Sequence, residues 1–275
     1  MKKERVDILL VEQGLFDSVE KAKRAIMAGI ILTDKNERID TAGEKIPVTT
    51  QLKRKGEILR YVSRGGLKLE KAMSIFDVTV KNKIMLDIGS STGGFTDAAL
   101  QHGAKLSYAL DVGTNQLSWK LRQDSRVVVM EQTNFRNSKL EDFKDGQPDL
   151  VSIDVSFISL RIILPVLKEI ISAGGDVLAL IKPQFEANRN DVGEKGIIHD
   201  PIIHQEVLIK MVQFSLDQGY DVEALSFSPI TGGQGNIEFL AHLKWNDKLK
   251  GFINEAIDIN NVVKMAHENF QAKQN

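Results

Sequence analysis

The chain has 275 residues, of which 42% are hydrophobic and 27% are charged, as in ordinary globular proteins. It contains no cysteine, which excludes a disulfide framework and any thiolate metal site. Asp7, Glu12 and Gln13 interrupt the apolar residues near the N-terminus, and no uncharged apolar run is long enough to span a membrane. The sequence therefore predicts neither a signal peptide nor a transmembrane helix, and we expect a cytoplasmic protein.

The net charge is −1, but basic residues are concentrated near the N-terminus. Residues 1–64 contain 14 Lys and Arg against 10 Asp and Glu, whereas the remainder contains 22 against 27. Segment 53–71, "KRKGEILRYVSRGGLKLEK", alone carries seven basic and two acidic residues. Such a run is either a solvated face or a basic arm that contacts RNA, and composition leaves both interpretations open.

The first 60 residues predict a small α+β unit. Apolar spacing indicates helices over 5–15 and 18–31, the second with Ser18 as its N-cap and Gly29 as its C-cap. Short β-type segments follow at Ile30–Thr33, Ile46–Thr49 and Ile58–Tyr61.

The order "RVDILLVEQGL", Ser18 and a basic helix ending at Gly29 resembles the alpha-L RNA-binding domain first described in ribosomal protein S-four. Val19 stands where that domain often has arginine, which would weaken one phosphate contact. The resemblance and the local excess of positive charge imply that this unit grips RNA backbone. The candidate RNA-binding residues are Arg5, Lys21, Lys23, Arg24, Lys53, Arg54, Lys55, Arg60 and Arg64.

From Lys68 onward, β and α patterns alternate, which predicts an α/β fold with a doubly wound, mainly parallel sheet. Helical patterns lie within 95–103, 159–171 and 201–219, and a last helix is expected within 265–275. The expected strands are Ile84–Asp87, Ser107–Asp111, Val127–Met130, Leu150–Ile153, Val177–Ile181, Val222–Ser226 and Ile237–Leu243.

The loop between the last two expected strands, "FSPITGGQGN", is too short for a parallel crossover. We therefore expect the final strand to be antiparallel. A seven-stranded sheet with an antiparallel last strand is the layout of the class I methyltransferase fold, which is Rossmann-like. The expected domains are 1–60 for RNA binding and 67–275 for a methyltransferase, joined by a linker at 61–66.

The stretch "LDIGSSTGGFTD", residues 86–97, reads as a strand, a Gly-rich turn and the start of a helix. It lacks both the G-x-G-x-x-G fingerprint of dinucleotide sites and the Lys of a P-loop. Asp87 ends the strand, and a carboxylate there repels phosphate but suits a ligand with an amine or a positive charge. S-adenosylmethionine carries both, while the alternative is a tight turn with no ligand.

Two later strands add polar residues at the same edge of the sheet. Asp111 follows Asp87 by 24 residues, the spacing at which an acidic residue accepts hydrogen bonds from a nucleoside ribose. Thr133 or Asn134, after the third strand, could meet the adenine edge, although Asn134 could equally be a helix cap. The candidate cofactor-binding residues are Asp87, Gly89, Ser90, Ser91, Thr92, Gly93, Gly94, Phe95, Asp111, Val112, Thr133 and Asn134.

Four charged residues are expected to meet at this rim. Asp154 and Lys182 end adjacent strands, Glu238 begins the antiparallel strand, and Lys68 lies in the first turn of the entering helix. Each alone could be a surface ion pair. Charged groups on buried strands are costly to desolvate unless they are paired or used, so their convergence indicates a catalytic site.

The motifs "YVSRGGLKL", "GSSTGGFTD", "ALDVG", "DVSFISL", "KPQFE" and "GNIEF" together resemble the TlyA (haemolysin A) family, over nearly the whole chain. That family is similar to RrmJ/FtsJ-type ribose 2′-O-methyltransferases, and the resemblance implies methylation of ribosomal RNA, at a cytidine, with S-adenosylmethionine as cofactor. Ser90 stands where the family often has Ala, and Gly66 and Leu67 where it has Ala-His, but neither change removes a charge. The family's Lys-Asp-Lys-Glu tetrad falls on Lys68, Asp154, Lys182 and Glu238.

The residue types fit this chemistry. A ribose hydroxyl needs a positioned base, and Lys182 is our candidate, although a lysine must become neutral to serve. The second ammonium, on Lys68, favours the neutral form, whereas Asp154 and Glu238 oppose it and are expected to orient the lysines and substrate. The five His are scattered, and we expect no metal. The alternatives are a non-catalytic RNA-binding ribosome-assembly factor and a membrane-active haemolysin.

Overall fold

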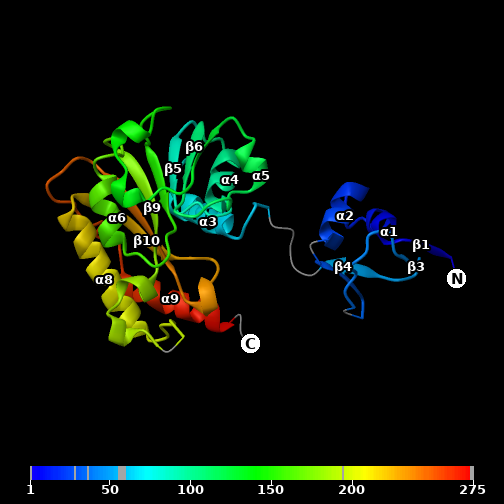
Figure 1. Ribbon diagram of the computed structural model, residues 1–275. Coiled ribbons are helices and arrows are strands. Elements are labelled where there is room, and N and C mark those ends of the chain that lie inside the picture. Colours follow the sequence, from blue (N-terminus) through cyan, green and yellow to red (C-terminus); the bar gives the residue numbers. More distant parts are fainter. Residues whose placement is uncertain (1, 28, 36, 55–59, 194, 273–275) are drawn as a thin grey trace. The chain divides into compact units, whose positions relative to one another are not determined.

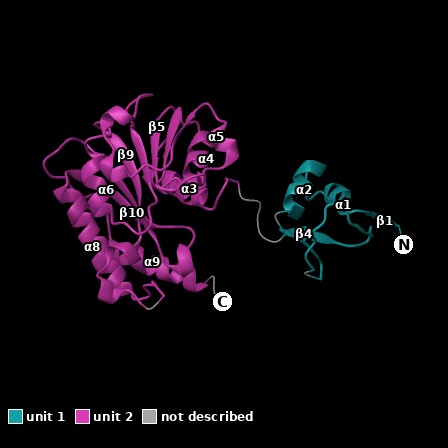
Figure 2. Ribbon diagram, in the orientation of Figure 1, with its two compact units in different colours: residues 1–59 teal, residues 60–275 magenta. Residues whose placement is uncertain are grey.

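The computed structural model describes residues 2–27, 29–35, 37–54, 60–193 and 195–272. The chain forms two compact units, Met1–Leu59 and Arg60–Asn275 (Figure 2). Segment 61–66, expected as a linker, instead belongs to the second unit. Tyr61 is only 3% exposed and packs in the core of that unit, and helix α3, Gly65–Phe76, already begins inside the segment.

The N-terminal unit packs two helices on two small antiparallel sheets. Ser18 accepts a hydrogen bond from the backbone N–H of Lys21 at 3.3 Å, and Gly29 has a left-handed φ of 68°, as the predicted caps require. The small core gathers apolar side chains from both helices and from each sheet. Its elements are β1 (Lys3–Arg5), α1 (Val6–Glu12), α2 (Val19–Met27), β2 (Ile31–Thr33), β3 (Lys45–Pro47) and β4 (Leu52–Arg54), with β1 pairing β3 and β2 pairing β4.

The strands of this unit differ from the prediction. The expected strand Ile58–Tyr61 is absent where it can be seen: residues 58 and 59 lie outside the described residues, and Arg60 and Tyr61 belong to no strand. The sheets use β1 and β4 instead, which were not predicted. Three-residue strands are too short to give a recognisable period-2 pattern.

The second unit is built on a seven-stranded sheet in the order β10-β11-β9-β8-β5-β6-β7 (Figure 1). Strand β11 is antiparallel to both β9 and β10, and the other pairings are parallel, as the short loop before β11 predicted. The strands are β5 (Ile84–Ile88), β6 (Leu106–Leu110), β7 (Val127–Met130), β8 (Leu150–Ile153), β9 (Gly175–Ile181), β10 (Tyr220–Phe227) and β11 (Phe239–Trp245).

Helices cover both faces of this sheet, and a buried apolar cluster fills each interface (Figure 1). Helix α9 begins earlier than the predicted 265–275. Short 3-10 turns at Phe135–Asn137 and Leu140–Asp142 connect β7 to β8. One face carries α3, α4 (Gly94–Gln101) and α5 (Trp119–Arg122), and the other carries α6 (Leu160–Leu167), α8 (Pro201–Asp217) and α9 (Ile259–Ala272), while α7 (Pro183–Glu186) directly follows β9.

Strand direction and register place the polar residues at one edge. The parallel strands β5, β6, β8 and β9 all end there, and Ile88 pairs with Ile153, so the Gly-rich loop starts beside Asp154. Strand β11 runs the other way and Phe239 pairs with Ile181. The residue before β11 therefore lies next to the residue after β9, which are Glu238 and Lys182.

Candidate active site

The four predicted charged residues form one continuous ion-pair cluster. Lys68 Nζ lies 3.0 Å from Asp154 Oδ2 and 2.7 Å from Glu238 Oε2. Lys182 Nζ lies 2.5 Å from Asp154 Oδ1. Asp154 thus bridges the two lysines, and Glu238 contacts Lys68. Lys68, Lys182 and Glu238 are buried, so these charges are largely removed from water.

The two lysines have different electrostatic environments. Burial by itself would lower the pKa of Lys68, but the carboxylates of Asp154 and Glu238 outweigh it and raise that pKa above its usual value. Burial would likewise raise the pKa of Asp154, but the two ammonium groups hold it below its usual range. Lys68 is therefore fixed in its charged form. Lys182 contacts one carboxylate, Asp154, and a neutral acceptor, Ser156 Oγ at 3.2 Å, whereas Lys68 lies between two carboxylates.

Two glycines allow the backbone to approach this cluster. Gly89 has a φ of 85°, and a Cβ on it would lie 2.5 Å from the carbonyl oxygen of Asp154. A Cβ on Gly232 would collide with the carboxylate of Glu238. The Gly-rich loop and the loop before β11 therefore both close on the charged residues, which larger residues would prevent.

A cavity of about 670 Å³, here called the large cavity, opens beyond the ends of β5 and β6. Its volume suits a small-molecule ligand. Asp111 connects its walls, because Oδ2 accepts the N–H of Ser91 at 2.8 Å and Oδ1 accepts the N–H of Gly113 at 2.7 Å. Of the expected cofactor-binding residues, it is lined by Gly89, Ser91, Asp111, Val112 and Asn134.

Asp87 does not face this cavity, contrary to the expectation from its position. It is 1% exposed, and its carboxylate accepts hydrogen bonds from Thr96 Oγ1 at 2.8 Å, Thr96 N at 3.1 Å and Ser152 Oγ at 2.8 Å. Burial, opposed by these bonds, raises the pKa of Asp87 to about 6. The carboxylate fixes the start of α4 against β8, and both of its oxygens accept hydrogen bonds from protein groups.

Two other expected residues, Thr133 and Gly93, line neither the large cavity nor the central cavity described below. Thr133 donates its hydroxyl hydrogen bond to the carbonyl of Glu131 at 3.1 Å. Gly93 is the N-cap of α4, in a left-handed conformation with φ of 93°. Conversely, the sequence analysis missed Gln116 and the segment 155–159, which line the large cavity. The "DVSFISL" motif contained that segment, but only its Asp was interpreted.

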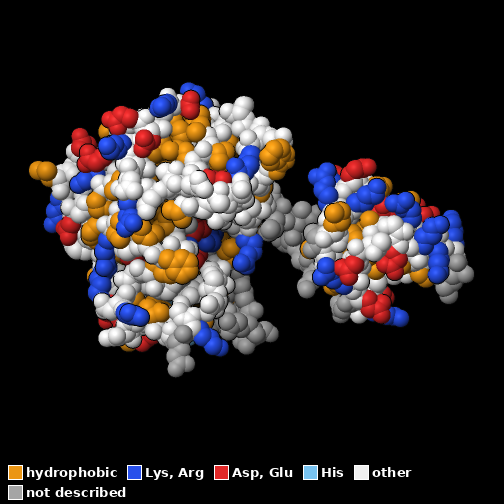
Figure 3. All heavy atoms as spheres, in the orientation of Figure 1, with side chains coloured by type: hydrophobic (Ala, Val, Ile, Leu, Met, Phe, Trp, Pro, Cys, Tyr) orange, Lys and Arg blue, Asp and Glu red, His pale blue; other side chains and the backbone are white. Residues whose placement is uncertain are grey.

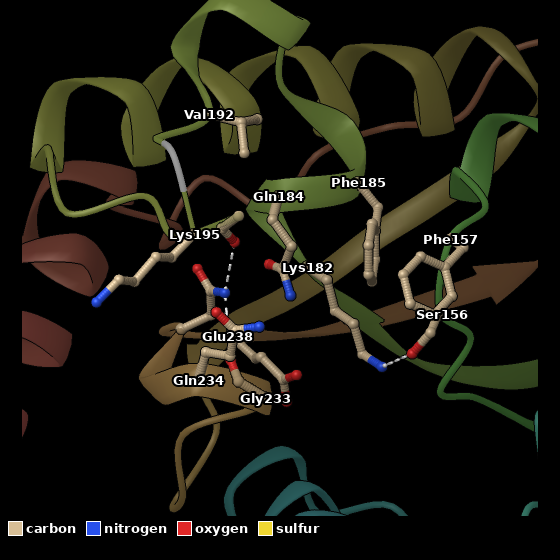
Figure 4. A pocket seen from close by; sticks show the side chains of 12 residues that line it. Ser156, Phe157, Lys182, Gln184, Phe185, Val192, Lys195, Gly233, Gln234 and Glu238 are labelled. Carbon is tan, nitrogen blue, oxygen red and sulfur yellow. Dashed lines mark hydrogen bonds between the residues drawn. The ribbon is translucent and has the colours of Figure 1, made fainter.

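Two further cavities meet the charged cluster. The central cavity, of about 340 Å³, is lined by all four charged residues. Its lining also includes the expected loop residues Ser90, Thr92, Gly94 and Phe95. The outer cavity, of about 260 Å³, has Lys182 and Glu238 in its lining (Figure 4). Asp154 lines the large and central cavities, and Lys182 the central and outer ones. The cluster therefore lies between the large and the outer cavity.

An exposed aromatic side chain stands at the mouth of these cavities. Phe157 is 92% exposed and has a left-handed φ of 64°, an unfavourable conformation for a bulky residue. Its ring centroid lies 5.2 Å from that of Phe185, and both rings line the outer cavity. Figure 4 shows the two rings above Ser156 and Lys182. Strain and exposure together indicate a functional role.

Comparison with known proteins identifies the family. A model of FtsJ-like methyltransferases matches residues 61–245. The chain belongs to this family. The Bacillus subtilis protein YqxC is 60% identical over 273 residues, which cover 99% of this chain and 97% of YqxC.

A second relative and a solved structure extend the likeness beyond the methyltransferase unit. The Mycobacterium tuberculosis protein named 16S/23S rRNA (cytidine-2′-O)-methyltransferase TlyA is 37% identical over 243 residues, or 88% of this chain and 90% of its own. A solved structure from Streptococcus thermophilus has 55% identity and a TM-score of 0.78, covering 100% of this chain and 99% of that chain.

The basic residues expected to bind RNA fall in both units. In the N-terminal unit, Figure 3 shows Lys and Arg side chains over α2 and toward β1, with Asp and Glu side chains among them. Arg5 pairs with Asp7 at 2.6 Å and Lys21 with Asp17 at 2.6 Å. Arg24 is exposed on α2.

The remaining members of this set have different surroundings. Lys23 is half-buried on α2, Lys53 Nζ donates to the carbonyl of Asp34 at 3.2 Å, and Arg54 stacks 4.0 Å above the ring of Phe16. Lys55 lies outside the described residues. Arg60 and Arg64 belong to the methyltransferase unit, where Arg60 pairs with Glu70 and exposed Arg64 lines the central cavity beside Lys68.

Within the described ranges, no group of three or more His, Asp or Glu side chains could hold a metal ion. His204, from the "HDPIIH" segment, is buried, and its Nδ1 lies 2.9 Å from Nε2 of His267. Among the same residues, no helix combines the length and the apolar character needed to cross a membrane.

Proposed function

We propose that this protein methylates the 2′-hydroxyl of a ribose in ribosomal RNA, at a cytidine, with S-adenosylmethionine as methyl donor. The observation that carries the proposal is the cluster of Lys68, Asp154, Lys182 and Glu238 between the large and outer cavities. The name of the Mycobacterium tuberculosis relative supports the same reaction and substrate.

The large cavity fits the cofactor. Gly89 lacks a Cβ, which lets the Gly-rich loop pack against the backbone of Asp154 at the edge of the cavity. Asp111 offers lone pairs beyond those that Ser91 and Gly113 use. Ribose hydroxyls are donors that such lone pairs accept. When bound, S-adenosylmethionine supplies a methyl group whose bond to sulfur breaks as its bond to the ribose oxygen forms. The residues that would hold it in the large cavity are Gly89, Ser91, Asp111, Val112 and Asn134, and Ser90, Thr92 and Gly94 of the same loop line the adjoining central cavity.

Lys182 is the base in this proposal. Its neutral amine takes the proton of the 2′-hydroxyl, and the hydroxyl oxygen becomes a better nucleophile as the proton leaves. Asp154 orients Lys182 through the 2.5 Å contact. Lys68 stays charged between Asp154 and Glu238, and this second positive charge favours loss of a proton from Lys182.

The RNA-binding role of the N-terminal unit is part of the same proposal. Its exposed basic side chains, such as Arg24, suit RNA phosphates, and Arg64 could hold a phosphate at the central cavity. The exposed ring of Phe157 and the half-buried ring of Phe185 offer a surface on which an unpaired base can stack. The outer cavity can admit a ribose only when its nucleotide is unpaired, because a base-paired duplex is too large to enter.

The test is methyl transfer from radiolabelled S-adenosylmethionine to unmodified ribosomal RNA and ribosomal subunits. The labelled RNA is digested to nucleosides, and the methylated product is identified. We expect 2′-O-methylcytidine, with no label after Lys182→Ala. Label on a base, or no label on any ribosomal RNA or subunit, would contradict the proposal.

A further inference from the structure

Ser156 occupies a position that the charged cluster alone does not explain. It lies in the loop after β8, two residues beyond Asp154, and it lines the large, central and outer cavities. Lys182 Nζ donates a hydrogen bond to Ser156 Oγ at 3.2 Å, and Figure 4 shows the two side chains directed at each other. Ser156 therefore touches the candidate base where the three cavities meet.

The contacts of Lys182 define a direction. A neutral lysine amine has two N–H donors and one lone pair, arranged tetrahedrally. Asp154 Oδ1 at 2.5 Å and Ser156 Oγ at 3.2 Å are the two acceptors around Nζ in the part of the chain that the structure describes. When both N–H groups point at these acceptors, the lone pair is left with the remaining tetrahedral position.

We infer that Ser156 is a positioning residue for Lys182. Ser156 Oγ accepts the second N–H of the neutral amine, so that the lone pair of Nζ faces the ribose 2′-hydroxyl. This inference rests on the proposed function. Without the Ser156 hydroxyl, Asp154 is the one remaining acceptor, and the amine can rotate about that hydrogen bond. The lone pair of Nζ then has no fixed direction. A base must lie within hydrogen-bond reach and alignment of the proton that it removes, so this freedom slows transfer.

Ser159, in the same loop, has a structural role that differs from that of Ser156. Ser159 Oγ donates to Glu186 at 2.6 Å and accepts the N–H of Arg161 at 3.1 Å at the start of α6. Ser156 is exposed and lines the cavities, and among the residues that the structure describes its side chain accepts a hydrogen bond from Lys182 alone. Removal of its hydroxyl takes little from the fold and acts mainly on Lys182.

The experiment compares the wild type with Ser156→Ala, Ser156→Thr and Ser215→Ala in the full chain. Ser215 provides a matched control, because it is a buried serine on α8 that donates to the carbonyl of Met211 at 2.9 Å, away from the site. Single-turnover methyl transfer to ribosomal RNA is measured between about pH 6 and pH 10 at saturating cofactor and RNA. Calorimetry with S-adenosylmethionine checks cofactor binding in each variant.

We expect Ser156→Ala to lower the maximal rate about tenfold, the equivalent of one hydrogen bond, with RNA and cofactor affinity little changed. Half-maximal rate should be reached at a lower pH, because an acceptor that stabilises the ammonium form has been removed. Ser156→Thr keeps the hydroxyl and should restore both values. Ser215→Ala should follow the wild-type profile.

Two results would overturn the inference alone while the wild type is active. One is a Ser156→Ala profile equal to that of Ser215→Ala. The other is a uniform loss at every pH that Ser156→Thr does not restore, which indicates a structural role. A wild type that transfers no methyl group overturns the proposed function and this inference together, so the two failures are distinguishable.

Discussion

Glu186 Oε2 accepts a hydrogen bond of 2.6 Å from Ser159 Oγ. The other carboxylate oxygen accepts the backbone N–H of Leu160 at 2.7 Å. Glu186 lies just beyond Lys182, and Ser159 just beyond Asp154 and Ser156. The buried carboxylate therefore ties together the two loops that carry the charged cluster.

Replacement of Glu186 should lower stability. Glu186→Ala leaves the buried N–H of Leu160 without its acceptor, and we expect the free energy of unfolding to fall by about 2 kcal/mol. Glu186→Gln keeps one acceptor oxygen and should lose less. Urea unfolding measures both, with Glu206→Ala, an exposed ion-pair residue on α8, as the control. Equal midpoints for Glu186→Ala and the control would contradict this role.

Asp87 should make stability depend on pH. Because burial raises the pKa of Asp87 to about 6, the unfolded chain loses this proton first as pH rises from about 4. Ionisation of Asp87 therefore costs wild-type stability across that window, up to about 3 kcal/mol. Asp87→Asn can still accept from Thr96 and removes this cost. Urea unfolding at pH 4 and pH 8 measures the free energy of unfolding of both proteins. The free energy of Asp87→Asn relative to the wild type should be higher at pH 8 than at pH 4, and the same difference at both pH values would contradict a raised pKa for Asp87.

The charged cluster could be predicted from the sequence, whereas the surroundings of Asp87 could not. Strand direction is readable from the alternating pattern, so the meeting of Lys68, Asp154, Lys182 and Glu238 at one edge was predictable. Asp87 was expected to end its strand, but β5 continues to Ile88, so Asp87 stays inside the ladder opposite Ser152. Its side chain therefore accepts from Thr96 and Ser152 on the face of the sheet and does not reach the large cavity.

Other features of the site were not predicted because they depend on the conformation of loops. Phe157 gains its exposure from a left-handed backbone, and no residue type in "DVSFISL" requires that conformation. Glu186 acts through a loop distant in sequence, so "KPQFE" could not show its partner. In the N-terminal unit, the helices were predicted from caps and apolar spacing, whereas β1 and β4 are too short to leave a pattern.

Asp111 should control cofactor affinity. Asp111→Ala removes the acceptors proposed for the ribose and also leaves the N–H of Ser91 unpaired, so we expect binding to weaken by about 1–3 kcal/mol. Calorimetry with S-adenosylmethionine measures this loss. Asp145→Ala, an exposed carboxylate between β7 and β8, is the control and should bind as the wild type does. Unchanged affinity in Asp111→Ala would remove the ribose assignment.

The basic residues of α2 should contribute to RNA affinity through phosphates. Lys23→Ala and Arg24→Ala should each weaken binding to ribosomal RNA and reduce the slope of log affinity against log salt by about one. Lys210→Ala on α8 removes the same charge from the other unit and should leave the slope unchanged. Binding titrations at several salt concentrations measure the slopes. Identical slopes in all variants would argue against this RNA surface.

The most direct test of the account compares Lys182→Arg with the wild type in single-turnover methyl transfer to ribosomal RNA, at saturating cofactor and RNA. Arginine keeps the positive charge but stays protonated at any working pH, so it cannot accept the hydroxyl proton. We expect Lys182→Arg to lower the rate about 10²–10⁴-fold, with cofactor and RNA binding retained. A Lys182→Arg variant that kept most of the wild-type rate would show that residue 182 supplies only charge, and the base assignment would fail.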